Sequence, residues 1–184
     1  MHKKIILAST SPRRKELLER EGIDFIVDAS FIEETLDDSL PIDERLRQLA
    51  IKKATPIHQK YPQDIVIGAD TVVYFENQVI GKAHSREEAN QILHRLSHHK
   101  HDVYTAVAIY DADTLTSFCE KTEVYFKDIT DMIEAYLDSN EWEGKAGAYG
   151  IQGAAEVFVD HIVGDKDNVI GLPVCRIKDY LLKK

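Results

Sequence analysis

The segment LASTSPRRKELL (residues 7–18) most constrains the fold, because a short apolar run changes directly into an amphipathic helix. The apolar run reads as a buried strand, Ser11 can cap the helix, and Pro12 suits its first position. A strand that runs into a helix start leaves unpaired backbone N–H groups with a partial positive charge. Arg13 and Arg14 add guanidinium groups at that same end, where basic residues are disfavoured. The segment therefore predicts an anion site, the alternative being ordinary solvated arginines beside a Ser-Pro cap.

The rest of the chain alternates strand-like and helix-like segments. Strands are expected at residues 25–29 and 64–71, in a hairpin over 72–82 that turns at Asn77, and at 101–113, 116–127 and 156–165. Helices are expected at residues 41–54, where Pro56 disturbs the end, and at residues 130–140. Two further helices are expected to begin at the Ser85–Glu88 capping box and at Pro173. This alternation predicts an α/β fold whose sheet is mixed rather than purely parallel.

Length and charge restrict the class of protein. The chain has 184 residues and a formal net charge of −9 at pH 7. We expect a single domain over residues 1–184, long enough to form two lobes around a cleft. The acidic balance argues against nucleic acid as a partner, but local cations suffice for a small polyanion. No apolar stretch is long enough to span a membrane, and Cys119 and Cys175 lack metal or disulfide spacing, so a cytoplasmic location is expected.

Acidic residues at strand ends are candidates for chemistry. Asp70 ends a strongly apolar strand, where open α/β sheets place their sites, and it can bind a metal, activate water or simply form a turn. Glu33 and Glu34 follow an earlier strand and could share a metal with Asp70, although on their own they are better explained as a solvated acidic loop. Lys53 and Lys82 are each more often solvated, but with the arginines they could neutralise several phosphate charges.

A glycine series marks a second candidate region. Gly144, Gly147, Gly150 and Gly153 are evenly spaced in GKAGAYGIQG, and glycine lets backbone approach a ligand closely. The series lacks the Lys-Ser/Thr ending of a nucleotide P-loop, so by itself it is a weak signal. Gln152 offers both a donor and an acceptor, which suits the edge of a base.

The histidine cluster HHKH, residues 98–101, raises the question of a metal site. The histidines are too tightly clustered for a preformed site, and no acid or cysteine accompanies them. We expect an exposed loop that precedes a strand.

Taken together, the motifs resemble one family over nearly the whole chain. The segments LASTSPRRKELL, IEE, KKA, IGADTVV, GK, YTAVAI, KTEV, GKAGAYGIQG and VIGLP fall in the order and spacing of the Maf family of nucleoside triphosphate pyrophosphatases. The resemblance implies an ITPase-like α/β fold, with a mixed twisted sheet flanked by helices and two lobes around a cleft. It also implies a cytoplasmic enzyme that converts a nucleoside triphosphate and water to the monophosphate and pyrophosphate, with a divalent metal cation, Mg²⁺ or Mn²⁺.

The resemblance assigns roles to individual residues. Asp70 matches the proton acceptor and Glu34 the other acidic position, with Glu33 adjacent, so these three are the implied metal ligands. The implied phosphate contacts are Ser9, Arg13, Arg14, Lys53 and Lys82, and Lys82 is also counted with Asp70 and Glu34 as catalytic.

The same resemblance distinguishes two branches by specificity. Arg13, Thr71 and Gln152 match the branch that acts on dTTP and UTP rather than the branch that acts on 7-methyl-GTP. The alternative function is a nucleotide-binding regulator of septum formation, which the intact Asp70 disfavours because a sensor needs no water activator. The preferred pyrimidine nucleotide and the oligomeric state, a homodimer among the alternatives, stay open.

Overall fold

The computed structural model describes residues 3–32, 35 and 37–183. Contacts divide the chain into two compact units. Unit 1 is Met1–Thr71, Thr105–Glu120 and Gly171–Lys184, and unit 2 is Val72–Tyr104 and Lys121–Ile170. The single domain expected over residues 1–184 stays a prediction.

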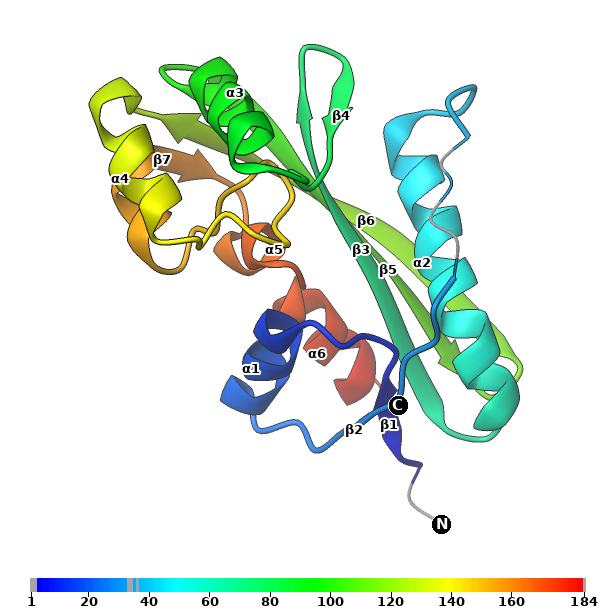
Figure 1. The fold of residues 1–184 in the computed structure, drawn as a ribbon. Helices are drawn as coiled ribbons and strands as arrows, with labels where there is room; N and C mark the ends of the chain where they lie inside the picture. Colours follow the sequence, from blue (N-terminus) through cyan, green and yellow to red (C-terminus); the bar gives the residue numbers. More distant parts are fainter. Residues whose placement is uncertain (1–2, 33–34, 36, 184) are drawn as a thin grey trace. The chain divides into compact units, whose positions relative to one another are not determined.

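Unit 1 contains the N-terminal strands and three of the helices. Its elements are β1 (Ile5–Leu7), α1 (Pro12–Arg20), β2 (Ile26–Val27), α2 (Ile42–Lys60) and α6 (Val174–Leu182), with the first part of β3 (Ile65–Phe75), the end of β5 (Lys100–Asp111) and the start of β6 (Thr114–Phe126) (Figure 1). Strand β1 pairs in parallel with both β2 and β3. Ile6 and Leu7 are fully buried, so the apolar run of the first segment forms the expected buried strand.

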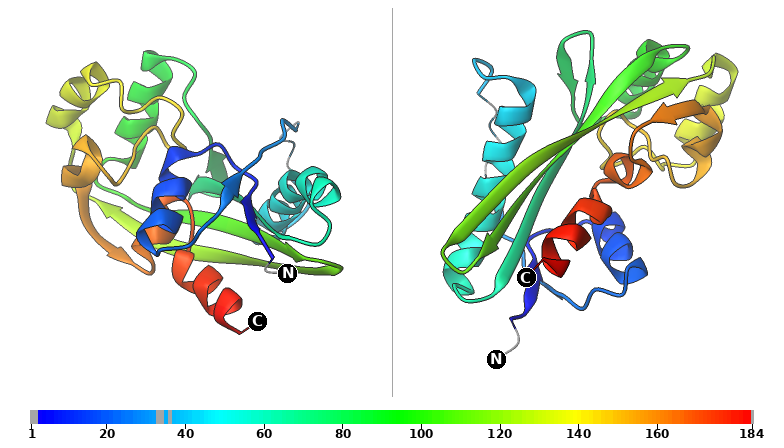
Figure 2. Two further views of the ribbon diagram at one scale, coloured as in Figure 1. Left: turned by 90° about the horizontal axis from the view of Figure 1, so that it is seen from below. Right: turned by 180° about the vertical axis from the view of Figure 1, so that it is seen from behind.

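Helix α2 packs closely against β3, and the two lie side by side in Figures 1 and 2. A Cβ atom at Gly68 would lie 2.7 Å from the carbonyl oxygen of Ala50 and 2.8 Å from the Cβ atom of Ala54. Glycine is therefore required for this close approach. The packing brings the face of α2 that carries Lys53 against the strand that carries Asp70.

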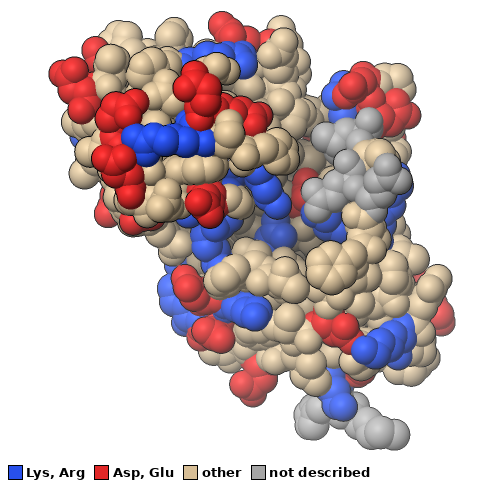
Figure 3. Space-filling view, viewed as in Figure 1, with Lys and Arg blue, Asp and Glu red and all other residues tan. Residues whose placement is uncertain are grey.

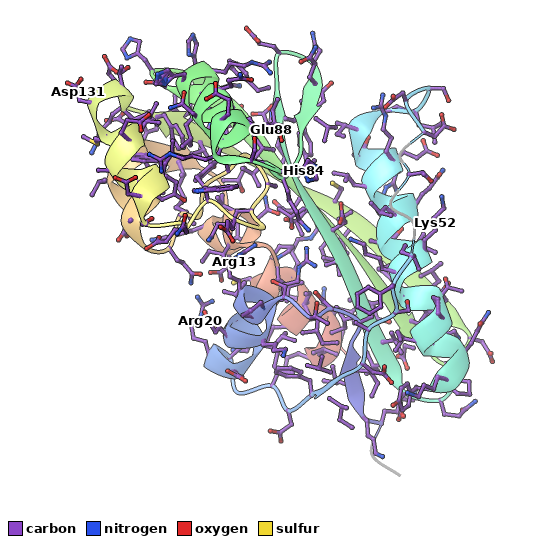
Figure 4. The ribbon with its side chains drawn as sticks, in the orientation of Figure 1. Arg13, Arg20, Lys52, His84, Glu88 and Asp131 are labelled. Atoms are coloured by element: carbon purple, nitrogen blue, oxygen red, sulfur yellow. The ribbon has the colours of Figure 1, made fainter. Side chains whose placement is uncertain are left out.

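Unit 2 contains the remaining elements. They are β4 (Gln78–Ile80), α3 (Arg86–Leu96), η1 (Thr130–Met132), α4 (Ile133–Asp138), η2 (Ala154–Phe158), β7 (Val159–Val163) and α5 (Lys166–Ile170), with the other parts of β3, β5 and β6. The Ser85 hydroxyl accepts from the Glu88 N–H at 3.1 Å, and the Glu88 carboxylate accepts from the His84 N–H at 2.7 Å (Figure 4). The reciprocal bonds cap the start of α3 as expected, with His84 rather than Ser85 as the backbone donor to the carboxylate.

The described strands pair in the order β2-β1-β3-β5-β6-β7, with β4 on β3. The strands expected at residues 101–113 and 116–127 correspond to β5 and β6, which are neighbours in the sheet (Figure 2). Parallel pairs around β1 and antiparallel pairs of β3 with β4 and of β6 with β7 confirm an α/β fold with a mixed sheet flanked by helices.

Three expectations about single elements are wrong. Helix α2 continues through Pro56 to Lys60, and Ile57 beyond the proline is only 4% exposed, so burial of this last turn favours a longer helix. Strand β3 does not end at residue 71 but continues to Phe75. Of the histidine cluster, His98 and His99 lie in the exposed connection before β5 as expected, but His101 lies on β5 and is 1% exposed.

Charged side chains of both signs are intermixed on the face drawn in Figure 3. Several form exposed ion pairs, such as Arg86 with Glu134 at 2.8 Å and with Asp138 at 2.9 Å. Exposed pairs of this kind contribute little to the free energy of unfolding, because water and salt screen them. None of the helices formed by the described residues is long and apolar enough to cross a lipid bilayer.

Candidate functional site

Arg14, in the first turn of α1, joins three separate segments of unit 1. Its Nε atom donates to the carbonyl oxygen of Gly171 at 2.8 Å, Nη1 to the Ser9 hydroxyl at 3.1 Å, and Nη2 to the Thr71 hydroxyl at 3.1 Å. Lysine could not reproduce this arrangement, because only the planar guanidinium presents donors in a fixed fork. Arg14 therefore fixes the loop after β1 against β3 and against the short segment that precedes α6.

The Ser9 hydroxyl is held by two donors. Its oxygen accepts from Arg14 Nη1 at 3.1 Å and from the backbone N–H of Ser11 at 3.2 Å. A hydroxyl oxygen has two acceptor lone pairs and one hydrogen, so Ser9 keeps its hydrogen to donate to a third group. Ser11 takes the cap position of α1 without forming a side-chain cap bond, which leaves the helix start open. This geometry suits an anion.

Thr71 and Thr105 continue the same network. Their hydroxyl oxygens are 2.9 Å apart, and the Thr71 hydroxyl also donates to the Gly171 carbonyl at 3.4 Å. Thr105 is fully buried. The network connects Arg14 to the residue that directly follows Asp70, so the position of α1 and that of the β3 carboxylate are linked through hydrogen bonds.

Asp70 is buried in unit 1 beside a cation. Its residue is 8% exposed, and its Oδ1 atom lies 2.5 Å from the ammonium nitrogen of Lys53. The Lys53 side chain is 16% exposed, so the two opposite charges compensate each other where water is largely excluded. Lys53, implied by resemblance to contact phosphate, thus contacts the implied proton acceptor here.

The metal ligands expected with Asp70 cannot be placed, since Glu33 and Glu34 lie outside the described residues. Within the described ranges, no group of three or more His, Cys, Asp or Glu residues converges as a metal site. Asp70 itself fits Mg²⁺ or Mn²⁺, because its second carboxylate oxygen is a hard ligand. Such ions often use one or two carboxylates together with substrate phosphates.

Arg13 and Lys82 are the two other predicted cations. Arg13 is half-buried in the first turn of α1 (Figure 4). Lys82 is exposed in unit 2, where it forms an isolated antiparallel bridge with Ala146 in the glycine-rich segment. The Gly147 N–H also donates to the Gly81 carbonyl at 3.0 Å. Unit 2 therefore brings Lys82 and the glycine-rich segment together.

The glycines of this segment serve close packing within the protein. Gly147 has φ +67°, and a Cβ atom there would lie 2.7 Å from Cγ2 of Val73. At Gly150, a Cβ atom would lie 2.7 Å from Cε of Lys145. The backbone thus approaches a strand and a lysine stem, and Gln152 is exposed in the turn that follows.

A buried His–Tyr pair supports the same segment of unit 2. His101 Nε2 lies 2.7 Å from the Tyr149 hydroxyl, and both rings pack edge-on against Phe126. Burial lowers the pKa of His101 to about 3 and raises the pKa of Tyr149, so both side chains are neutral at physiological pH. The pair is a structural support rather than a metal site.

Sequence reasoning did not identify Thr105, Gly171 or His101 as supports of the site. Thr105 lies in the YTAVAI segment and Gly171 in VIGLP, both of which carry the family resemblance, so their motifs were the available signal. For His101, the signal was its register in the strand, because Val103 and Thr105 on the same face are also buried.

The fold defines the class of protein first. A HAM1 protein from Coxiella burnetii is similar to this chain with a TM-score of 0.53 and 15% identity, covering 100% of both chains. This likeness concerns the fold alone, and it agrees with the mixed sheet flanked by helices.

Sequence relatives then define the family. A family model of Maf-like proteins matches residues 4–184. A dTTP/UTP pyrophosphatase of Bacillus cereus is 46% identical over 176 residues, which cover 95% of this chain and 87% of that protein. One of Bacillus anthracis is 45% identical over 176 residues, covering 95% and 92% respectively. The chain belongs to the Maf family.

Proposed function

We propose that this protein hydrolyses dTTP and UTP to the nucleoside monophosphate and pyrophosphate. Membership of the Maf family and the dTTP/UTP pyrophosphatase relatives support the proposal. The two free cysteines support a reducing cytoplasmic location.

One structural observation carries the proposal. Unit 1 links an open helix start to a buried carboxylate, since Arg14 bonds both Ser9 in the loop before α1 and Thr71 next to Asp70. The helix start and the Ser9 hydroxyl suit phosphate oxygens, and the buried Asp70 carboxylate suits activation of water. The groups that bind phosphate and the carboxylate that activates water would therefore act on the same substrate molecule.

Each residue of the proposed site has a separate role in the hydrolysis. Asp70 accepts a proton from water, and the water oxygen forms a bond to the innermost phosphorus. The bond from that phosphorus to the bridging oxygen breaks, and pyrophosphate leaves. Lys53 holds the Asp70 carboxylate in place, and Arg14 positions the Ser9 hydroxyl, which donates to a phosphate oxygen. Arg13 and Lys82 offset the negative charge of the triphosphate.

A divalent cation, Mg²⁺ or Mn²⁺, would be held by Asp70 together with Glu33, Glu34 and phosphate oxygens. When bound, it would neutralise charge that develops on the phosphates.

The base is selected by uncharged contacts, because the triphosphate is common to all candidate substrates. The Gln152 amide can donate to a pyrimidine carbonyl and accept from the ring N–H. Glutamate at this position would only accept, which suits a guanine edge and repels the carbonyls of thymine and uracil. Arg13 and Thr71, the other two positions of the dTTP/UTP pattern, support the same assignment.

A nucleotide panel tests the proposal. Pyrophosphate release is measured from dTTP, UTP, CTP, GTP and 7-methyl-GTP, with and without Mg²⁺ or Mn²⁺, for the wild type and for Gln152→Glu. We expect the wild type to release pyrophosphate from dTTP and UTP only when the metal is present. In Gln152→Glu, the rates with these two substrates should fall selectively, by about tenfold or more. Equal slowing of all five substrates would show that Gln152 does not read the base, and release from none would refute the proposed function.

A further inference from the structure

A single carboxylate holds the far side of the turn that carries Gln152. Glu141 Oε2 accepts from the backbone N–H of Ala154 at 2.9 Å, two residues after Gln152. Ala154 is the first residue of η2, and the N–H groups at a helix start have no partner within the helix. The Glu141 carboxylate supplies that partner from thirteen residues earlier in the chain.

The backbone at Gly153 is shaped around the same carboxylate. Gly153 has φ +101°, and a Cβ atom there would lie 2.6 Å from Glu141 Oε2. A side chain at this position would both strain the backbone and displace the carboxylate. Glu141 therefore contacts the chain at residues 153 and 154, directly beside Gln152.

The segment around Glu141 also contacts the other side of the turn. The Glu141 carbonyl accepts from the Lys145 ammonium group, and the stem of Lys145 lies against Gly150. The Glu141 N–H is itself held by the Ser139 hydroxyl at 3.2 Å. The turn from Gly150 to Ala154 is thus held at both ends by residues 141–145, all within unit 2.

We propose that Glu141 is a positioning residue for nucleotide specificity, acting through Gln152. This inference rests on the proposed function and on Gln152 as the reader of the base. An exposed amide discriminates between bases only if its backbone is held, because a mobile turn lets it adapt to purine and pyrimidine edges alike. Releasing the Ala154 N–H should therefore reduce the preference for pyrimidines more than it reduces the overall rate.

Three variants separate this role from simple support of the fold. Glu141→Ala removes the acceptor, Glu141→Gln keeps an amide oxygen that can accept from Ala154, and Glu143→Ala is the matched control in the same segment, since Glu143 is exposed. The readout is the ratio of kcat/KM for dTTP to that for GTP. We expect this ratio to fall about fivefold in Glu141→Ala, the effect of one lost hydrogen bond, and to stay within about twofold in the other two.

Amide hydrogen exchange at Ala154 provides a readout that needs no activity. Exchange should be faster in Glu141→Ala than in the wild type or in Glu143→Ala. Faster exchange with an unchanged dTTP-to-GTP ratio would overturn the proposal, because Glu141 would then merely cap η2. Unchanged exchange would overturn it as well, since the turn would not depend on Glu141. Failure of the proposed function is seen separately, as a wild type that hydrolyses neither dTTP nor UTP.

Discussion

Replacing His101 with glutamine should make the protein less sensitive to acid. His101 is 1% exposed, and burial lowers the pKa of its imidazole from the ordinary 6.5 to about 3. The folded protein therefore keeps the ring neutral, with Nε2 2.7 Å from the Tyr149 hydroxyl. Glutamine does not titrate in this range but can still form a hydrogen bond with Tyr149.

The magnitude follows from linked protonation. Below about pH 6.5 the unfolded chain binds a proton at His101, whereas the folded chain does so only near pH 3. The stability that the neutral His101 ring contributes is therefore fully present above about pH 6.5 and is lost as the pH falls from there towards about 3. Each pH unit corresponds to about 1.4 kcal/mol, so lowering the pH to about 5 should cost about 2 kcal/mol of unfolding free energy.

Urea unfolding at about pH 7 and about pH 5 measures this difference. The wild type should lose about 2 kcal/mol more than His101→Gln between the two conditions, because the other titrating groups are common to both proteins. His94→Gln is the control, since His94 is exposed on α3, and it should behave like the wild type. Equal losses in the wild type and His101→Gln would refute the assignment of a buried neutral histidine.

Three further predictions concern the site and its support. Asp70→Asn should lower kcat about a hundredfold or more while dTTP still binds by calorimetric titration, because the proton acceptor is lost and the phosphate contacts remain. Arg14→Lys should lower kcat/KM for dTTP about tenfold or more, since the single ammonium nitrogen of lysine cannot reach the three acceptors that three separate guanidinium nitrogens bond, whereas Arg20→Lys at the exposed end of α1 should change it less than twofold. Gly68→Ala should lower the unfolding free energy in urea by about 1–3 kcal/mol through its clash with α2, and Gly81→Ala, where a Cβ atom meets open space, should cost less.

Local patterns in the sequence predicted most of the elements. The Ser-Pro helix start, the turn at Asn77 and the capping box at Ser85 depend on residues close in the chain, and the structure has each of these elements. Pro56 misled the prediction because the burial of Ile57 outweighs the local preference of proline to end a helix. Propensity is a weak guide wherever tertiary packing opposes it.

The contacts between site residues could not be predicted from local patterns. Arg14 bonds the Gly171 carbonyl from 157 positions away, and His101 meets Tyr149 across 48 positions. Such pairs depend on how the strands are ordered in the sheet, which no single motif encodes. Resemblance identified Asp70 and Lys53 as site residues but not their direct ion pair, and the roles of all site residues stay predictions.

Hydrolysis of dTTP in water labelled with heavy oxygen tests the central claim most directly. If water attacks the innermost phosphorus, mass spectrometry should find the label in dTMP and none in the inorganic product, which should be pyrophosphate. Label in orthophosphate would contradict the account, because water would then have attacked the outermost phosphorus and the protein would be a phosphatase of another kind.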